Sequence, residues 1–196
     1  ALVAQWTASS FTVSYNANGA TAGSAPADGA FTTGVSFLTS TNSGNLVKSG
    51  YTFAGWNTSA AGTGTSYGEN SALTTTANIT LYAKWTIISP LITFNQGSAT
   101  TTPSVFPANT SAQYGSLYTL PATDTSTVIS SVTQVFTGWS DGTNTFAVGD
   151  TYRIGTTNVT FTAQWVAVYT VRYVLNGGSG TVPADILRTN AFSETL

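Results

Sequence analysis

The strongest constraint on this chain is an internal repeat with a period of 79 to 80 residues. A short segment ending in tryptophan occurs three times, at Trp6, Trp85 and Trp165. A Phe-x-Gly-Trp segment occurs twice, at residues 53–56 and 136–139. Several markers that return in the same order at nearly the same spacing indicate structural units that are built alike.

A third marker opens each unit, because the aromatic residues Tyr15, Phe94 and Tyr173 are each 79 residues apart. The links between successive units are short, so we expect the units to pack closely as neighbours. The markers divide the chain into the closing strand of a preceding repeat (1–6), a complete repeat (9–85), a complete divergent repeat (90–165) and the opening part of a further repeat (168–196).

The markers themselves read as β-strands. In residues 79–85 the apolar side chains alternate with polar ones, and residues 159–165 repeat the same alternation. A period of two is typical of a strand with one buried face and one solvent face. Turn signals such as Asn18-Gly19 and Asp141-Gly142 lie between the strands. We therefore predict a mostly β fold with antiparallel or mixed sheets, and an α+β fold stays open.

Composition supports the β prediction and removes several classes of function. The 196 residues include 38 Thr and 22 Ser, only 6% charged residues, and no His, Cys or Met. Without His or Cys there is no Ser-His-Asp or Cys-His catalysis, ordinary zinc site or disulfide. Five cations are too few to neutralise a run of phosphates, so we expect no nucleic acid partner. No apolar run reaches about 18 residues, so we expect no membrane insertion.

The repeated aromatic residues have two interpretations. Exposed rings could form a platform on which sugars stack. The alternative is a hydrophobic core, which we favour because the tryptophans occupy equivalent positions in the two units. These tryptophans are Trp56, Trp85, Trp139 and Trp165.

The acidic residues have two functional interpretations, a catalytic pair and a calcium site. Asp141 and Asp150 lie nine residues apart across a predicted hairpin, and Asp124 lies upstream. Glycoside hydrolysis would need two positioned carboxylates. A calcium site could use Asp141, Asn144 and Asp150, although their spacing lacks the ladder of a calcium loop. Because Asp in Gly-flanked turns commonly bonds its own backbone, we predict no catalytic, cofactor-binding or metal site.

Lysine and asparagine residues offer two covalent alternatives. Lys48 or Lys84 could form an isopeptide bond, which needs a lysine and a carboxylate buried together; Lys84 falls on the solvent side of its strand, so we expect none. The Asn-x-Ser/Thr pattern occurs about as often as chance predicts, so we assign no glycosylation. Its four copies begin at Asn57, Asn78, Asn109 and Asn158.

Taken together, these motifs resemble the Listeria–Bacteroides repeat, also called the internalin B-repeat. The resemblance covers the first complete unit, from Tyr-Asn-x-Asn-Gly through residues 50–58 and 62–67 to the closing segment at 78–85. The second unit is a divergent copy, with Thr133-Gln134 in place of Gly-Tyr. The resemblance implies small β-grasp-like repeats in tandem on large secreted or surface-anchored bacterial proteins, often adhesins, and no catalytic motif.

We therefore expect a non-enzymatic, extracellular or cell-surface spacer segment of an adhesin-like protein. A subunit of a self-assembling extracellular fibre or sheath is the first alternative, because the end segments are partial repeats. A carbohydrate- or receptor-binding module is the second alternative. The expected partners are neighbouring repeats of the same protein, with other copies of the chain or a host or surface ligand left open.

Overall fold

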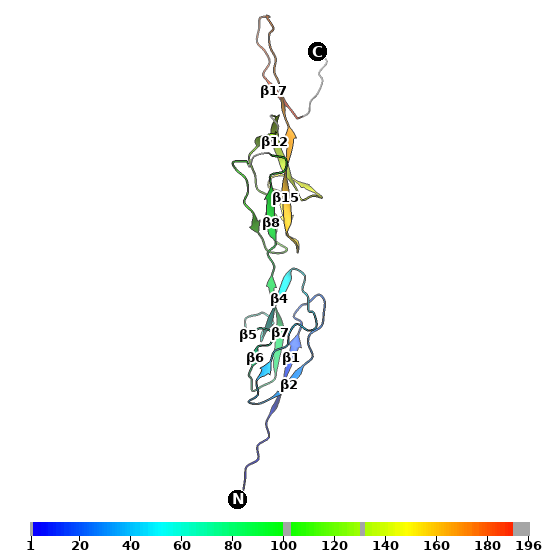
Figure 1. The fold of residues 1–196 in the computed structure, drawn as a ribbon, viewed down its shortest axis with the longest axis vertical. Coiled ribbons are helices and arrows are strands. Elements are labelled where there is room, and N and C mark those ends of the chain that lie inside the picture. Colours follow the sequence, from blue (N-terminus) through cyan, green and yellow to red (C-terminus); the bar gives the residue numbers. More distant parts are fainter. Residues whose placement is uncertain (1, 100–102, 130–131, 190–196) are drawn as a thin grey trace. The chain divides into compact units, whose positions relative to one another are not determined.

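The computed structural model describes residues 2–99, 103–129 and 132–189 (Figure 1). The chain divides into two compact units, residues 1–88 and 89–196. Strands and loops make up the described ranges, which contain no helix. The prediction of a mostly β fold is confirmed, and the β-grasp likeness stays a prediction.

The first unit is built on a five-stranded mixed sheet in the order β2-β1-β7-β4-β5. Strand β1 pairs in parallel with β7, and the other neighbours in the sheet are antiparallel. A two-stranded ladder, β3 with β6, lies outside it. The strands are β1 (Ser10–Asn16), β2 (Gly29–Thr32), β3 (Phe37–Leu38), β4 (Tyr51–Asn57), β5 (Ser66–Tyr67), β6 (Ala72–Leu73) and β7 (Ile79–Ile87).

The second unit has the corresponding strands in the same arrangement. Strand β15 pairs in parallel with β8 and antiparallel with β12, and β12 also pairs with β13. Strand β9 pairs with β8, β10 with β14, and β16 with β17. The strands are β8 (Leu91–Asn95), β9 (Thr110–Ser111), β10 (Leu117–Thr119), β11 (Ser126–Ile129), β12 (Val132–Ser140), β13 (Thr145–Phe146), β14 (Thr151–Arg153), β15 (Val159–Ala167), β16 (Tyr169–Val171) and β17 (Ile186–Arg188).

The predicted alternation in the closing strands is confirmed. In β7, Leu81 and Ala83 are fully buried while Thr80 is exposed. In β15, Phe161 and Ala163 are buried in the same way. Each closing strand is central in its sheet, with the unit's first strand on one side and the Phe-x-Gly-Trp strand on the other. This central place explains why the closing segment is the most regular marker of the repeat.

The Phe-x-Gly-Trp marker is a β-bulge, which the period-two prediction did not include. In β4, Phe53 pairs with Trp85 and Trp56 pairs with Ala83, so β4 carries one residue more than β7 there. The extra residue turns both aromatic rings of the motif to the buried face. Gly55 makes this possible, since its φ is +98° and an added Cβ would lie 2.3 Å from the carbonyl oxygen of Tyr67.

The same bulge occurs in the second unit. The register of β12 against β15 shifts between Phe136 and Gly138. Gly138 has φ +144°, and an added Cβ would lie 2.2 Å from the Phe146 carbonyl oxygen. The glycine of this motif is therefore required by backbone contact, not only by flexibility.

The main sheet of the second unit differs from that of the first by an additional strand. Strand β11 pairs antiparallel with the first half of β12, from Ser126 with Val135 to Ile129 with Val132. The first unit has no strand at the corresponding place within its described residues. Residues 133–134, which stand in place of the Gly-Tyr of the first unit, belong to the part of β12 that pairs with β11.

Each unit has its own core around one fully buried tryptophan. Trp56 and Trp139 are both 0% exposed. Trp85 and Trp165 are half-buried and pack against the two cores. The prediction that the repeated tryptophans are core residues is confirmed.

Candidate functional site

The most repeated geometry in the chain surrounds the parallel pairing of each unit's first and last long strands. We call these pairs, β1 with β7 and β8 with β15, the terminal strand pairs. Four residue pairs form each ladder, beginning with Val13 opposite Ile79 and with Ile92 opposite Val159. The paired residues are repeat-equivalent in the two ladders, so the first and last long strands pair in the same register in both units.

An asparagine side chain extends each ladder beyond its first residue pair. The Thr12 backbone N–H donates to Oδ1 of Asn78 at 2.9 Å. In the second unit, the Leu91 N–H donates to Oδ1 of Asn158 at 2.8 Å. Each asparagine comes directly before its closing strand, so its amide oxygen acts as one more rung between the two strands.

A tryptophan fixes the opposite end of each pair. The Trp85 indole N–H donates to the Asn18 carbonyl at 3.0 Å, and the Trp165 indole N–H donates to the Gln96 carbonyl at 2.8 Å. In the first unit, the Asn18 side-chain amide also donates to the Ala83 carbonyl at 2.9 Å. The turn after the first strand is therefore tied to the last strand by side chains.

Ring contacts connect the same elements through each core. The Phe53 ring centroid lies 5.1 Å from Trp56 and 5.7 Å from Trp85. Tyr15 on the first strand lies 4.6 Å from Trp56. The second unit repeats these three contacts, at 5.1, 5.4 and 5.0 Å. Edge-to-face packing of this kind supplies a large buried area in a fixed geometry.

Tyr15 adds a hydroxyl group to this ring cluster. Its hydroxyl oxygen accepts a hydrogen bond from the Ser40 backbone N–H at 2.7 Å. Burial raises the pKa of Tyr15 above its ordinary value of 10.0, and the bond from Ser40 partly offsets that rise. The equivalent position in the second unit is Phe94, which lacks a hydroxyl.

The other two Asn-x-Ser/Thr asparagines are also engaged within the fold. Asn57 is 1% exposed, and its amide nitrogen donates to the Gly64 carbonyl at 3.0 Å and to the Ser66 hydroxyl at 2.9 Å. Asn109 accepts from the Phe94 backbone N–H at 3.0 Å. Two of these roles have a signal in the sequence, because Asn78 and Asn158 fall at equivalent positions of the repeat. Asn57 and Asn109 have no such signal.

The acidic residues that are candidates for a catalytic pair or a calcium site make hydrogen bonds within the second unit. The Asp141 carboxylate accepts from the backbone N–H groups of Asn144 and Thr143 at 2.7 and 2.9 Å. These bonds hold the pKa of Asp141 below its ordinary value. Asp150 accepts from the Ala147 N–H at 2.7 Å, and Asp124 accepts from the Ser104 hydroxyl. The residues described contain no group of three or more acidic side chains placed to hold a metal ion.

The two lysines line a hollow of about 310 Å³ in the first unit. Lys48 places its ammonium nitrogen 4.7 Å from the centre of the Tyr51 ring, and Lys84 donates to the Ser66 hydroxyl at 2.9 Å. No acidic side chain lines this hollow, whereas an isopeptide bond would require one beside the lysine. Trp85 and Asn18 complete its wall.

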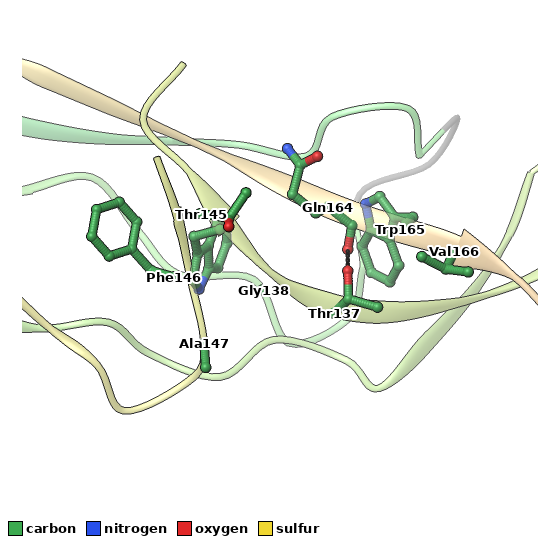
Figure 2. A pocket seen from close by; sticks show the side chains of 9 residues that line it. Thr137, Gly138, Thr145, Phe146, Ala147, Gln164, Trp165 and Val166 are labelled. Carbon is green, nitrogen blue, oxygen red and sulfur yellow. Dashed lines mark hydrogen bonds between the residues drawn. The ribbon is translucent and has the colours of Figure 1, made fainter. Parts of the chain in front are cut away.

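A second hollow, of about 410 Å³, lies beside the bulge of the second unit. Figure 2 shows Phe146 at one side and Trp165 with Val166 at the other, with Gln164 between them. The Thr137 hydroxyl donates to the Gln164 carbonyl at 3.2 Å. No charged side chain lines it, and this hydrogen bond is internal to the sheet.

The residues that build the first terminal strand pair and its core coincide with a known family. Residues 11–84 match the family model described as the Listeria-Bacteroides repeat domain. Residues 11–84 belong to that family. The predicted resemblance of the first unit is thus confirmed, and the tandem arrangement of such repeats stays a prediction because the match covers this segment alone.

A relative of the repeat-containing chain comes from Evansella cellulosilytica and carries the provisional description "Gly-rich membrane protein". The two are 33% identical over 201 residues, which is 95% of this chain and 22% of the relative. The chain thus spans about a fifth of the length of the relative it matches. No solved structure matches the chain.

These matches indicate a repeat domain and no enzyme family. Within the described ranges, no helix has both the length and the hydropathy that a membrane span requires.

Proposed function

We propose that the chain is a non-catalytic spacer segment of a large bacterial cell-envelope protein of the adhesin type. In this role the repeat holds a binding domain away from the cell and itself binds only neighbouring repeats. The observation that carries the proposal is the matched geometry of the two terminal strand pairs. In each unit the chain enters at one end of the pair and leaves at the opposite end.

The comparisons support the same proposal. The relative is several times longer than this chain and is described as a membrane protein. A repeat domain inside a long envelope protein fits a role in which length is the property that matters. The surface of the chain is also poor in lysine, which suits an exposed location that proteases reach.

The experiment is an immunoblot of fractionated source cells with an antibody raised to residues 9–165. A species far above 20.2 kDa in the cell-envelope fraction is the expected result. A band near the mass of the chain, released from cells and sedimenting as fibres, would instead favour the fibre alternative. A band confined to the cytosol would refute both.

A second candidate function is binding of an anionic polysaccharide, and the lysine-lined hollow favours it. Both cations of residues 1–88, Lys48 and Lys84, line this one hollow together with Tyr51 and Trp85. Two ammonium groups beside aromatic rings suit a sugar that carries a carboxylate.

Nuclear magnetic resonance titration of the 196-residue chain with oligogalacturonate tests this candidate. Shifts confined to residues that line the hollow, and lost in Lys48→Gln with Lys84→Gln, would support it. Neutral oligogalactose and the Arg153→Gln variant, which changes a cation of the second unit, are the controls. Equal shifts in all variants would dismiss the candidate.

A further inference from the structure

The terminal strand pairs have a property that a passive spacer does not need. In the first unit the chain enters at the start of β1 and leaves at the end of β7, and the two strands are parallel neighbours. Tension applied to the two ends therefore pulls β1 and β7 in opposite directions along their common axis. All hydrogen bonds between the strands are then strained together, instead of opening one after another.

We infer that each unit is a tension-resisting clamp, with the terminal strand pair as the part that resists force. The inference rests on the proposed spacer function for its biological role, because only a protein fixed at one end and bound at the other is stretched. The clamp itself is a mechanical property of each unit and is tested separately.

The side chains at the ends of each pair support this inference, because they add bonds at the two places where sliding would begin. Asn78 bonds Thr12 at the entry end, and Trp85 bonds Asn18 at the exit end. A structural need for burial alone would not require a donor at the tryptophan or an acceptor at the asparagine. The second unit repeats the arrangement with Asn158 and Trp165.

Tension also reaches the clamps with little slack. Three residues separate the end of β7 at Ile87 from the start of β8 at Leu91. Pro90, within this link, is buried, and its carbonyl accepts from the Ala112 N–H. The three residues of the link span at most about 10 Å when fully extended, so the link lengthens little before the next strand pair is pulled.

The first experiment compares two pulling directions on the first unit within the 196-residue chain. Because the chain contains no Cys, handles can be attached at introduced cysteines. Ser9→Cys with Ser89→Cys loads the pair in shear, whereas Ser9→Cys with Ala77→Cys pulls both strands from the same end. All three positions are exposed. We expect the unfolding force in shear to exceed the peeling force by at least about twofold, since force-driven unfolding follows the barrier that is loaded. Equal forces would overturn the inference.

The second experiment removes the end bonds. Trp85→Phe should lower the shear force by more than it lowers the peeling force, because its bond lies at the exit end, away from the peeling handles. Asn78→Ala should lower both forces, because its bond lies at the entry end, which both pulls load. Asn57→Ala is the matched control, because it destabilises the same unit without contact to β1, and it should leave the ratio of the two forces unchanged. A ratio of shear force to peeling force that is the same in Trp85→Phe and Asn57→Ala would assign Trp85 to folding alone.

A third experiment joins β1 and β7 covalently. Ser14 and Thr80 are cross-strand neighbours on the solvent face, so Ser14→Cys with Thr80→Cys allows a disulfide. Oxidation should shorten the unfolding step by about 230 Å, since about 66 residues at 3.5 Å each leave the extensible chain. An unchanged step in the oxidised protein would show that the two strands do not pair this way. None of these outcomes depends on where the chain resides in the cell, so the spacer proposal is tested independently.

Discussion

At the scale of single residues, the Tyr15 side chain gives the stability of the first unit a dependence on alkaline pH. Tyr15 is buried beside Trp56, and its pKa lies above the ordinary value. A raised pKa means that the folded state keeps the phenol proton more tightly than the unfolded state does. The stability linked to that proton is fully present below about pH 10 and is lost as the pH rises toward the folded pKa.

Tyr15→Phe should therefore make the first unit less sensitive to alkaline pH. At neutral pH the variant loses the bond from Ser40, which costs about 1 kcal/mol. Hydrogen exchange measured between pH 7 and 11 reports the two units separately. The second unit, with Phe94 at this position, is the internal control. The prediction is contradicted if the variant and the parent lose first-unit stability at the same pH.

Asn57 is a polar residue buried in the first unit. Asn57→Ala should reduce the free energy of unfolding by about 2–3 kcal/mol, because its buried amide bonds the loop that follows β4. The equivalent residue in the second unit is Ser140, whose hydroxyl accepts one bond from the Gly142 N–H. Ser140→Ala should cost about 1 kcal/mol or less in a urea titration. Equal losses would mean that the amide network contributes little.

At the scale of the element, the bulge explains why the Phe-x-Gly-Trp motif has its spacing. Core residues of a regular strand lie two apart, whereas Phe53 and Trp56 lie three apart and both face the core. The bulge at Gly55 accounts for the additional residue. The motif therefore encodes the bulged backbone at its glycine as well as the two aromatic rings.

Gly55→Ala should destabilise the first unit by about 3 kcal/mol or more, because the new Cβ overlaps the Tyr67 carbonyl and φ is positive. Gly62→Ala is the matched control, since Gly62 also has positive φ but open space around it. That change should cost only about 1–2 kcal/mol. Thermal unfolding followed by circular dichroism measures both variants, and similar midpoints would count against the role of the contact.

Sequence patterns predicted the strands that carry the repeat and missed what lies between them. The alternation of apolar and polar side chains over 79–85 and 159–165 is sufficient to predict the closing strands, because each of them has one buried face. The bulge could have been found, since the three-residue spacing of two core aromatics around a glycine departs from period two. Strand β11 could not be predicted from the repeat, because residues 126–129 have no counterpart strand among the described residues of the first unit.

The candidate site was harder to predict than the fold. The equivalence of Asn78 and Asn158 was visible in the sequence, but their bonds to the first strand depend on a parallel pairing between residues far apart in the chain. The turn role expected for Asp141 and Asp150 needs only local geometry, and the structure shows it. Local hydrogen bonds are thus predictable from sequence, whereas contacts between the first and last strands are not.

At the scale of the whole molecule, the spacer proposal makes a prediction about dimensions. A compact protein of 196 residues has a radius of gyration of about 16 Å. A spacer should give a clearly larger value in small-angle X-ray scattering of the monomer. A value near 16 Å would contradict the spacer. Measurement over a range of concentrations also tests the fibre alternative, which predicts that the apparent mass rises with concentration.

The engaged asparagines have a consequence for how this protein can be made. Four asparagines stand in Asn-x-Ser/Thr patterns, and each side chain is already hydrogen-bonded within the fold: Asn57, Asn78, Asn109 and Asn158. A eukaryotic secretory pathway attaches a bulky oligosaccharide to such residues. The sugar is joined to the amide nitrogen, and the buried Asn57 nitrogen donates to the Gly64 carbonyl and the Ser66 hydroxyl. A sugar added to Asn57 during synthesis would block these two bonds, whereas the other three asparagines accept through their amide oxygen. Yeast or mammalian secretion should therefore yield misfolded or retained material, while bacterial expression, which leaves these amides unmodified, should yield the folded chain.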